Sequence, residues 1–415
     1  FEDREGHIWI GSLGGGLMRF REPPFTTVGT PEGLNEPLVK SVWVDPDRRV
    51  MAATFGGGYN LGAEGKFLRI SNPDKGANYA QSVLADRQNR VWIGSYDRGL
   101  YRLAPESNQL IREPAVPKVE IRASFEARNG SLWFGAPDRA YRLHEGNWTE
   151  LSLPPGVDTG ITCFAQAPDR EDIYAGTTTA GLFRFDGQQF SRVRLDDRFD
   201  REGIASLLFL SEERYLIGTF DLGLVISDQG KMIHLDHRRE FPSSGISSFT
   251  RHQDALWIGT NRGIIRMEHD HLIQMIHDPT LTFIGQVFTQ SDGLSSIECP
   301  VGFQPTVSTD RHGRIWFASG KGIYSIRPSQ LQLNLVQPPI VFEELSYLDA
   351  SNSIQKRLSK THPSGFSLPP DHSNITVKFT SPTFISPEKL MFETTLIGPT
   401  GTIRKRQSAR EILFH

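Results

Sequence analysis

The stretch DRQNRVWIGS, residues 86–95, joins a polar turn to a short apolar run in which Trp92 stands two residues before Gly94. The pattern recurs along most of the chain, with another residue replacing the tryptophan in three copies. Its small residue lies at positions 11, 53, 94, 135, 176, 218, 259 and 318, so successive copies are 41 or 42 residues apart until a last step of 59. A period of about 40 residues predicts a repeat architecture.

Each copy carries the signature of four short strands. A first apolar strand, such as residues 41–44, leads through an Asp-containing turn to the strand with the tryptophan. A Gly-containing turn, a third strand that alternates apolar and basic residues and a variable fourth strand follow. Four antiparallel strands in about 41 residues are typical of one β-propeller blade. The tryptophan rings are expected between neighbouring sheets, and the small residue is expected to let those sheets approach.

The last seven copies favour a seven-bladed ring within residues 21–335. A strand near residues 25–28 is expected to close the last blade, because a closed ring leaves no free edge. Residues 1–20 then form the end of a preceding propeller or a first partial blade, and the alternative is one eight-membered or incomplete ring. A long loop, residues 284–305, accounts for the last, longer step.

The repeat stops after Pro328, and a different β pattern follows. Residues 337–339 read as a linker, and the runs 340–345, 375–379 and 390–396 read as strands separated by Pro and Ser clusters. Residues 338–415 are therefore expected to be the first part of an immunoglobulin-like β-sandwich, cut before its final strands. The predicted fold class is all-β, a propeller followed by this truncated sandwich.

Composition excludes several classes of function. The 45 basic and 48 acidic residues give a net charge of −3 without a long block of one sign, which argues against nucleic-acid binding. No run of about 18 apolar residues is present, so a membrane contact is expected only through segments outside this sequence. Cys163 and Cys299 form no zinc-type motif, the scattered histidines indicate no metal site, and no nucleophile elbow is present. We expect no metal, no cofactor and no enzyme activity in this chain.

The repeats resemble those of two-component-regulator propellers. Residues 86–95 and 310–317 carry the resemblance, as do Asp292–Gly293–Leu294 and the closing run 320–328. The tail resembles the "three-Y" immunoglobulin-like domain that follows such propellers: residues 375–379 fit an early strand, and Leu396 and Gly398 match its Leu-x-Gly. Phe392 and Thr394 depart from the two preceding tyrosines of that pattern.

The resemblance implies the extracytoplasmic, periplasmic sensing region of a bacterial signal-transduction receptor. Such receptors pass a binding signal across the inner membrane to a histidine kinase or diguanylate cyclase. The implied partners are a small polar ligand, with carbohydrate among the candidates, and a second copy of the chain bound through the sandwich or adjoining segments. The alternative is a protein–protein interaction scaffold without a small-molecule ligand.

The turns between the second and third strands of the blades are the predicted ligand site. They emerge on one rim of the ring and bring aromatic, acidic and basic groups around one mouth, a mixture that suits a polar ligand. The same residue types are also common in solvated turns. The candidate residues are Tyr96, Asp97, Arg98, Asp138, Arg139, Asp221, Asn261 and Arg262. The long loop 284–305 is a second candidate, because long loops in compact repeats often carry function.

Overall fold

A computed structural model describes residues 1–45, 49–63, 66–70, 75–104, 109–331, 338–351, 353–358, 372–384, 390–398 and 401–414. Two compact units make up the chain: Pro23–Leu331 is one, and Phe1–Glu22 together with Gln332–His415 is the other. The predicted linker, residues 337–339, begins at a residue outside the described ranges. The predicted end of the ring, residue 335, also lies outside them. Each unit is described by itself below.

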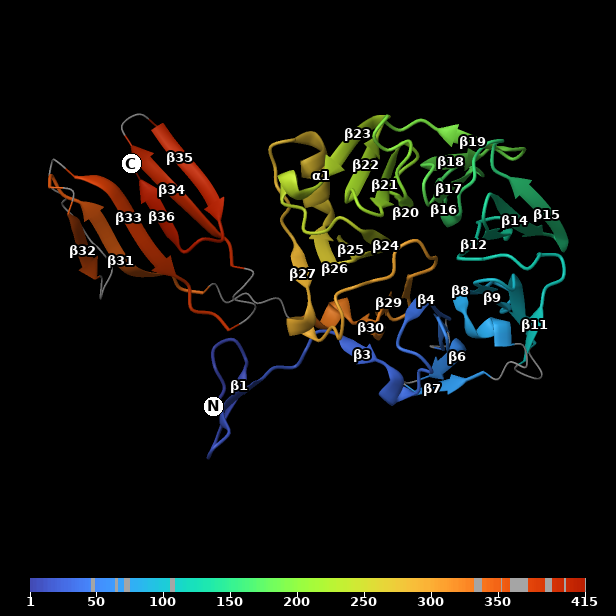
Figure 1. Ribbon diagram of the computed structural model, residues 1–415, viewed down its shortest axis with the longest axis horizontal. Coiled ribbons are helices and arrows are strands. Elements are labelled where there is room, and N and C mark those ends of the chain that lie inside the picture. The colour runs from blue at the N-terminus through green and yellow to red at the C-terminus, as the bar shows by residue number, and fades with distance from the viewer. Residues whose placement is uncertain are drawn as a thin grey trace. The chain divides into compact units, whose positions relative to one another are not determined.

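The larger unit is a ring of four-stranded antiparallel sheets, with seven such sheets in the described residues (Figure 1). Each sheet is one blade, and the first strand of each lies nearest the centre. In chain order the blades are β4(Val39–Val44) β5(Val50–Thr54) β6(Gly58–Ala63) β7(Lys66–Arg69); β8(Ala80–Ala85) β9(Val91–Ser95) β10(Leu100–Leu103) β11(Leu110–Arg112); β12(Ala123–Glu126) β13(Leu132–Gly135) β14(Arg139–His144) β15(Asn147–Ser152); β16(Ile161–Gln166) β17(Ile173–Thr177) β18(Leu182–Phe185) β19(Phe190–Val193); β20(Ile204–Phe209) β21(Arg214–Thr219) β22(Leu224–Asp228) β23(Lys231–Leu235); β24(Ile246–His252) β25(Ala255–Thr260) β26(Gly263–Glu268) β27(Gln286–Phe288); and β28(Val307–Thr309) β29(Ile315–Ser319) β30(Gly322–Ile326) with β3(Thr26–Val28).

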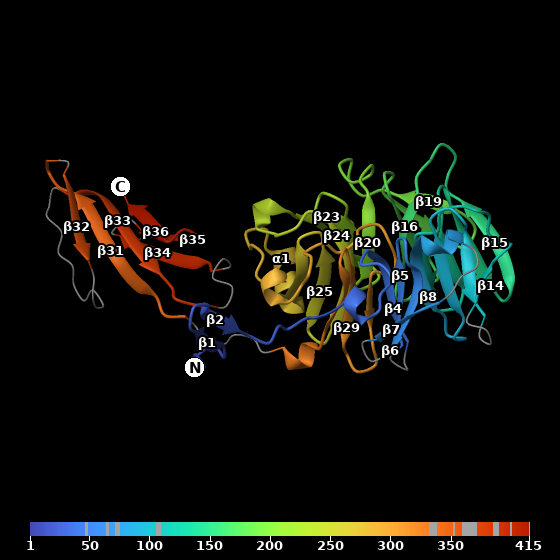
Figure 2. The same cartoon turned by 60° about the horizontal axis from the view of Figure 1, so that its bottom comes forward.

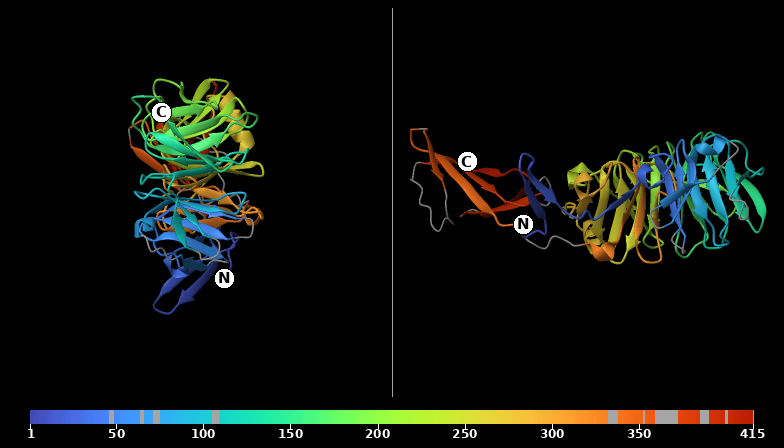
Figure 3. Two further views of the ribbon diagram at one scale, coloured as in Figure 1. Left: turned by 90° about the vertical axis from the view of Figure 1, so that its right-hand side faces the viewer. Right: turned by 90° about the horizontal axis from the view of Figure 1, so that it is seen from below.

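The strand that closes the ring comes from the start of the unit. β3 pairs antiparallel with β30, with Val28 opposite Ile323, and supplies the fourth strand of the last blade. The prediction that residues near 25–28 close this blade is confirmed. The views of Figures 2 and 3 show the sheets of the ring standing side by side around its axis.

The tryptophan of the repeat is held by the turn that precedes it. Trp92 is 2% exposed, and its Nε1 donates a hydrogen bond of 3.0 Å to the Asp86 carboxylate, which also accepts from the backbone N–H of Arg90. Asp310 and Trp316 repeat the arrangement at 3.5 Å. A buried indole N–H is normally paired, and in these two copies the Asp six residues earlier supplies the partner. Trp133 Nε1 donates to Ser131 Oγ instead, and Trp257 Nε1 has no partner among the described residues.

The small residue after the tryptophan is required by the next blade. A Cβ on Gly94 would lie 2.3 Å from the carbonyl oxygen of Ile121, and a Cβ on Gly135 would lie 3.0 Å from that of Ile161. Both contacted residues lie where the chain enters the following blade. Close approach of adjacent sheets, expected from the repeat pattern, is therefore present in the structure.

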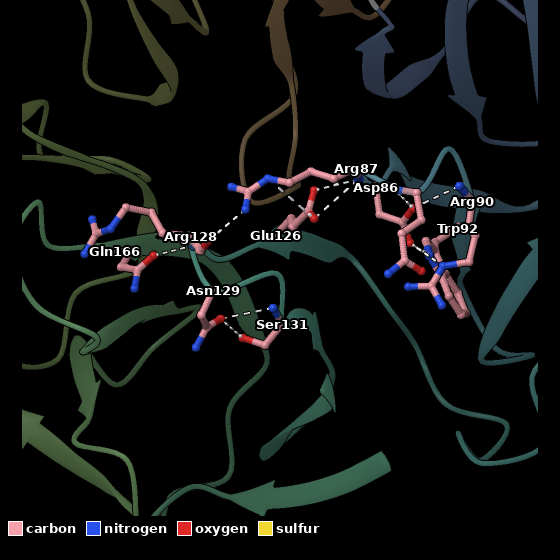
Figure 4. A network of polar contacts seen from close by, with 10 residues as sticks. Asp86, Arg87, Arg90, Trp92, Glu126, Arg128, Asn129, Ser131 and Gln166 are labelled. Carbon is pink, nitrogen blue, oxygen red and sulfur yellow. Dashed lines mark hydrogen bonds and ion pairs between the residues drawn. The ribbon is translucent and has the colours of Figure 1, made fainter. Parts of the chain in front are cut away.

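A chain of arginines on one rim links consecutive blades, at the turns between first and second strands (Figure 4). Arg87 donates to the carbonyl of Arg128 at 2.7 Å and lies 3.7 Å from the Glu126 carboxylate. Arg128 in turn donates to the carbonyls of Ala167 and Arg170 in the next blade. Each guanidinium therefore ties its own turn to the next one along the ring.

Replacing Arg128 by alanine is expected to destabilise the protein by about 1–2 kcal/mol, because two charge-assisted hydrogen bonds between blades are lost. Urea denaturation followed by far-UV circular dichroism measures the change. Arg201→Ala, at an exposed position, is the matched control and should change stability by less than about 0.5 kcal/mol. An equal effect of the two substitutions would show that the arginine chain contributes nothing specific.

The long insertion before the last blade differs from the predicted loop. After β26 the chain forms a helix, α1(His269–His277), which buries Leu272, Met275 and Ile276 against the sixth blade. The fourth strand, β27, then occupies residues 286–288, inside the range 284–305 expected to be loop. The repeat pattern does not predict β27, because a strand of three residues shows too little alternation of apolar and polar side chains to be recognised.

Residues 298–306, named here the plug segment, run through the centre of the ring (Figure 1). The Gln304 N–H donates to the carbonyl of Arg122, and its carbonyl accepts from Ser124 N–H, both at 3.0 Å. The Gln304 side-chain amide accepts a hydrogen bond from the Phe164 N–H at 2.7 Å and donates one to the Phe164 carbonyl at 2.8 Å. Pro305 accepts from Val42 N–H at 3.0 Å. Free backbone groups of three innermost strands are thereby paired.

The smaller unit contains a hairpin and two further sheets. The hairpin is β1(Ile8–Ser12) with β2(Gly16–Phe20). One sheet has the order β32(Ile354–Leu358), β31(Val341–Leu348), β33(Ser373–Thr380), β36(Glu411–Phe414), and the other pairs β34(Phe392–Gly398) with β35(Gly401–Gln407). Phe379 and Phe392 are buried, with ring centroids 4.9 Å apart, and join the two sheets. That these sheets form an immunoglobulin-like sandwich stays a prediction, as does the assignment of residues 1–20 to the end of a preceding propeller or to a first partial blade.

Short 3-10 helices and two cysteines complete the described chain. The 3-10 helices are η1(Thr30–Glu32), η2(Lys75–Asn78), η3(His237–Arg239), η4(Gln290–Asp292) and η5(Pro328–Gln330). Cys163 and Cys299 are free and buried, and burial raises the pKa of each thiol to about 12. Within the described ranges, no helix combines the length and the apolar character that a membrane span requires.

Candidate ligand-binding mouth of the ring

The turns between second and third strands share a rim with the loops that enter each blade. Tyr96 N–H donates to the carbonyl of Tyr79 at 2.9 Å, and Ile121 N–H donates to the carbonyl of Ser95 at 2.9 Å. A turn of one blade therefore lies against its own entering loop and against that of the next blade. This rim is opposite the arginine chain, because successive antiparallel strands turn at opposite ends.

On this rim the first three blades and the plug segment bring together a group of side chains, which we name the mouth cluster. Its members are aromatic, cationic, acidic and amide residues. They are Lys40, Phe55, Tyr79, Gln81, Tyr96, Glu120, Arg122 and Phe303.

Aromatic rings form the exposed part of the mouth cluster. The Phe55 ring centroid lies 5.1 Å from that of Tyr79 and 5.9 Å from that of Tyr96. Tyr79 is 45% exposed and Tyr96 52% exposed, and each contacts the Phe55 ring edge-on, at interplanar angles of 61° and 84°. Exposed aromatic rings offer apolar surface to a ligand.

Two cations lie beside these rings. Lys40 Nζ is 4.5 Å from the centroid of Phe303 and 5.8 Å from that of Phe55. The Arg122 guanidinium carbon is 5.7 Å from the centroid of Phe303. Both cations are therefore within cation–π distance of the ring that the plug segment presents.

Burial is the main cause of a lowered pKa at Lys40, and the positive charge of Arg122 lowers it further, while Glu120 acts in the opposite direction. Glu120 is already engaged, since its carboxylate accepts from Arg122 at 2.5 Å and from Gln81 Nε2 at 2.8 Å. The ammonium of Lys40 is thus partly desolvated next to another cation, a state that an anion would stabilise.

Two buried polar atoms of the mouth cluster have no hydrogen-bond partner among the described residues: Gln81 Oε1 and Arg122 Nε. Gln81 is 2% exposed. Unpaired buried polar atoms are rare and costly, and in a protein that binds ligands they often mark the place where a ligand or water completes the network.

The predicted residues Tyr96, Asp97 and Arg98 lie on this rim as expected. Tyr96 belongs to the mouth cluster, whereas the Arg98 guanidinium lies 3.7 Å from the Asp97 carboxylate. The turn is held by its backbone, because Arg98 N–H donates to Ser95 Oγ at 2.9 Å.

The other predicted residues lie on the same rim but outside the mouth cluster. Arg139 makes a bidentate pair with Asp138, at 2.8 Å for both hydrogen bonds, and this hydrogen bonding is the main cause of the lowered pKa of Asp138. Asn261 accepts from Ser243 Oγ at 2.6 Å and so fixes the loop that enters its blade. Asp221 and Arg262 are exposed.

Sequence reasoning named Tyr96, and its second candidate, the loop 284–305, contains Phe303; it missed the other six members of the mouth cluster. Lys40, Gln81 and Arg122 lie at or beside the starts of first strands, and Tyr79 and Glu120 lie in the loops before those strands. The repeat pattern could have placed these five on the predicted rim, because entering loops and second turns meet at one end of a blade. No repeat position predicts Phe303.

Two further places, outside the mouth cluster, gather polar side chains. Asp3, Glu5 and His7 come close enough for a metal ion. However, the Asp3 carboxylate already accepts from Trp9 Nε1, and the Glu5 carboxylate accepts from Phe384 N–H. On the rim with the arginine chain, a hollow is lined by Pro168, Asp169, Leu210, Ser211, Glu212, Glu213, Arg214, Asp228 and Gln229.

Comparison with known proteins identifies the fold. No protein-family model matches the sequence, and no curated protein matches it. The whole chain matches the structure of the extracellular domain of the hybrid two component system BT3049 from B. thetaiotaomicron, at a TM-score of 0.70 and 18% identity, and spans 56% of that chain. It also matches the extracellular domain of the hybrid two component system BT4673 from B. thetaiotaomicron, at a TM-score of 0.55 and 13% identity, over 100% of this chain and 57% of that one.

A third match has a different function. Virginiamycin B lyase from Staphylococcus aureus, in a catalytically inactive form with quinupristin, aligns with 74% of this chain and 99% of its own, at a TM-score of 0.58 and 13% identity. The chain thus shares the β-propeller fold of all three. Its match to the two-component extracellular domains extends over the full chain, including the residues that follow the ring.

Proposed function

We propose that this chain is the extracytoplasmic ligand-sensing region of a bacterial signal-transduction receptor. The observation that carries the proposal is the match of the whole chain, ring and following sheets together, to extracellular domains of two-component systems. A propeller fold alone decides no function, since the same fold serves a lyase. The order of a ring followed by a second β unit is a more specific resemblance.

In this proposal the mouth cluster binds a small polar ligand, with carbohydrate among the candidates, and does not transform it. Binding shifts the balance between two arrangements of the receptor, which requires different affinities of the ligand for the two. The receptor is of the histidine kinase or diguanylate cyclase type, lies in the inner membrane with this region in the periplasm, and dimerises through the second unit or adjoining segments.

A thermal-shift screen of the 415-residue chain against oligosaccharides and other small polar compounds tests the proposal. A ligand present at 100 times its dissociation constant should add about 2.7 kcal/mol of stability. The double variant Tyr79→Ala with Tyr96→Ala should abolish the shift, because it removes the exposed aromatic surface of the mouth cluster. The matched control, Arg139→Ala on the same rim, should keep it.

Two other outcomes overturn parts of the proposal. A ligand whose shift survives the double variant moves the site away from the mouth cluster. If no compound of a broad library stabilises the chain and a protein partner is captured instead, the scaffold alternative is favoured. A compound that is recovered chemically changed after incubation would make the chain an enzyme.

A further inference from the structure

The mouth cluster contains two cations and one carboxylate. Glu120 is paired with Arg122, through the 2.5 Å hydrogen bond, and with the amide of Gln81. Lys40 contacts the rings of Phe55 and Phe303, and in the described residues no carboxylate lies within ion-pair distance of its ammonium. One positive charge is left over where the cluster is partly desolvated, and a single negative charge would balance it.

The surroundings of this surplus charge also restrict the ligand. Lys40 lies against Phe55, whose ring contacts those of Tyr79 and Tyr96, so an anion at Lys40 is adjacent to two exposed aromatic surfaces. Gln81 is bonded to Glu120 through Nε2 and leaves Oε1, on the same planar amide, as an unpaired acceptor. The cluster therefore combines a site for an anion, two exposed aromatic rings and an unpaired acceptor that a hydroxyl or a bridging water can satisfy.

We propose that the mouth cluster binds an acidic sugar, with the carboxylate at Lys40 and Arg122 and the sugar ring on Tyr79 and Tyr96. This inference rests on the proposed function and specifies the class of its ligand. A carboxylate accepts charge-assisted hydrogen bonds from both cations, which neutral sugars cannot do. A hydroxyl of the same sugar, directly or through water, donates to Gln81 Oε1. Simple anions such as acetate supply only the first contact and should bind far more weakly.

Isothermal titration calorimetry of the full chain tests the proposal with matched pairs of probes. Oligosaccharides of glucuronate, galacturonate and mannuronate are each compared with the neutral oligosaccharide of the same linkage, and acetate serves as the anion without a sugar ring. At least one acidic probe should bind at least about tenfold more tightly than its neutral counterpart. Its affinity should decrease between 50 and 500 mM NaCl, because salt screens the charge contact, as the Debye length of about 10 Å at 0.1 M implies.

Variants assign the charge contact to named residues. Lys40→Met and Arg122→Met keep much of the side-chain length and remove the charge. Each should lower the affinity for the acidic probe by about tenfold or more. Arg262→Met, on the same rim but outside the mouth cluster, should leave its affinity unchanged. Circular dichroism and thermal unfolding without ligand establish that the variants are folded. If a methionine variant fails to fold, Lys40→Arg is measured as well; it keeps the charge and should retain most of the affinity.

The outcomes separate this inference from the proposed function. If a neutral sugar binds as tightly as its acidic counterpart, and the Tyr79 and Tyr96 variants lose this binding, the sensing site stands but the assignment of an acidic ligand is wrong. If an acidic probe binds but Lys40→Met and Arg122→Met leave its affinity unchanged, the assignment to these cations is wrong. If no acidic probe binds more tightly than its neutral counterpart, the inference is overturned.

Discussion

Replacing Trp133 by alanine is expected to lower the free energy of unfolding by about 3–5 kcal/mol, the range for a large aromatic side chain removed from a core. Trp133 is 2% exposed, and its ring centroid lies 5.2 Å from that of Phe185 and 6.0 Å from that of Phe164, both in the following blade. Its Nε1 donates to Ser131 Oγ at 3.0 Å. The indole therefore joins two sheets, and alanine would leave a cavity between them.

Urea denaturation followed by far-UV circular dichroism measures this effect without relying on tryptophan fluorescence. Trp133→Phe should cost less, because the smaller ring still fills part of the site. The exposed Tyr96→Ala should change stability by less than about 0.5 kcal/mol. A loss below about 1 kcal/mol for Trp133→Ala would contradict the claim that the repeat tryptophans hold neighbouring blades together.

Replacing Gln304 by alanine is expected to destabilise the ring by about 2–4 kcal/mol, because it leaves the N–H and the carbonyl of Phe164 without their partner. Both groups belong to β16, an innermost strand that is the edge of its sheet and pairs with no other strand on that side. The substitution should also displace the neighbouring Phe303, which contacts Lys40 and Arg122. Ligand affinity at the mouth cluster should therefore decrease together with stability.

The same denaturation experiment measures the Gln304 effect, with Gln188→Ala as the control because Gln188 is exposed in a turn. The control should be within about 0.5 kcal/mol of the unsubstituted protein. Equal stabilities of the two variants would show that the plug segment is a passive loop and that the inner strands do not depend on it.

The sequence predicts the ring well because its blades share one spacing of strands, turns and small residues. A turn carboxylate that holds an indole N–H, as Asp86 holds Trp92, and a glycine that admits the next sheet, as Gly94 does, leave a pattern that spacing alone reveals. The closing strand could be predicted because a ring with a free edge is unfavourable.

The parts that occur once could not be predicted in this way. The helix α1 and the plug segment interrupt the repeat, so no second copy supports their interpretation. The mouth cluster combines Lys40, Arg122 and Phe303, which are far apart in sequence and meet only because the plug segment reaches the mouth. Sequence reasoning placed Tyr96 on this rim and named the loop that contains Phe303 as a second candidate, but it did not select the other residues that surround them.

The most direct test of the mouth cluster as the sensing site is a crystal structure of the chain with the tightest ligand from the thermal-shift screen. We expect the ligand to lie against Tyr79 and Tyr96, with its negative group at Lys40 and Arg122. A ligand bound instead in the hollow beside Leu210 and Arg214, on the opposite rim, would contradict the account.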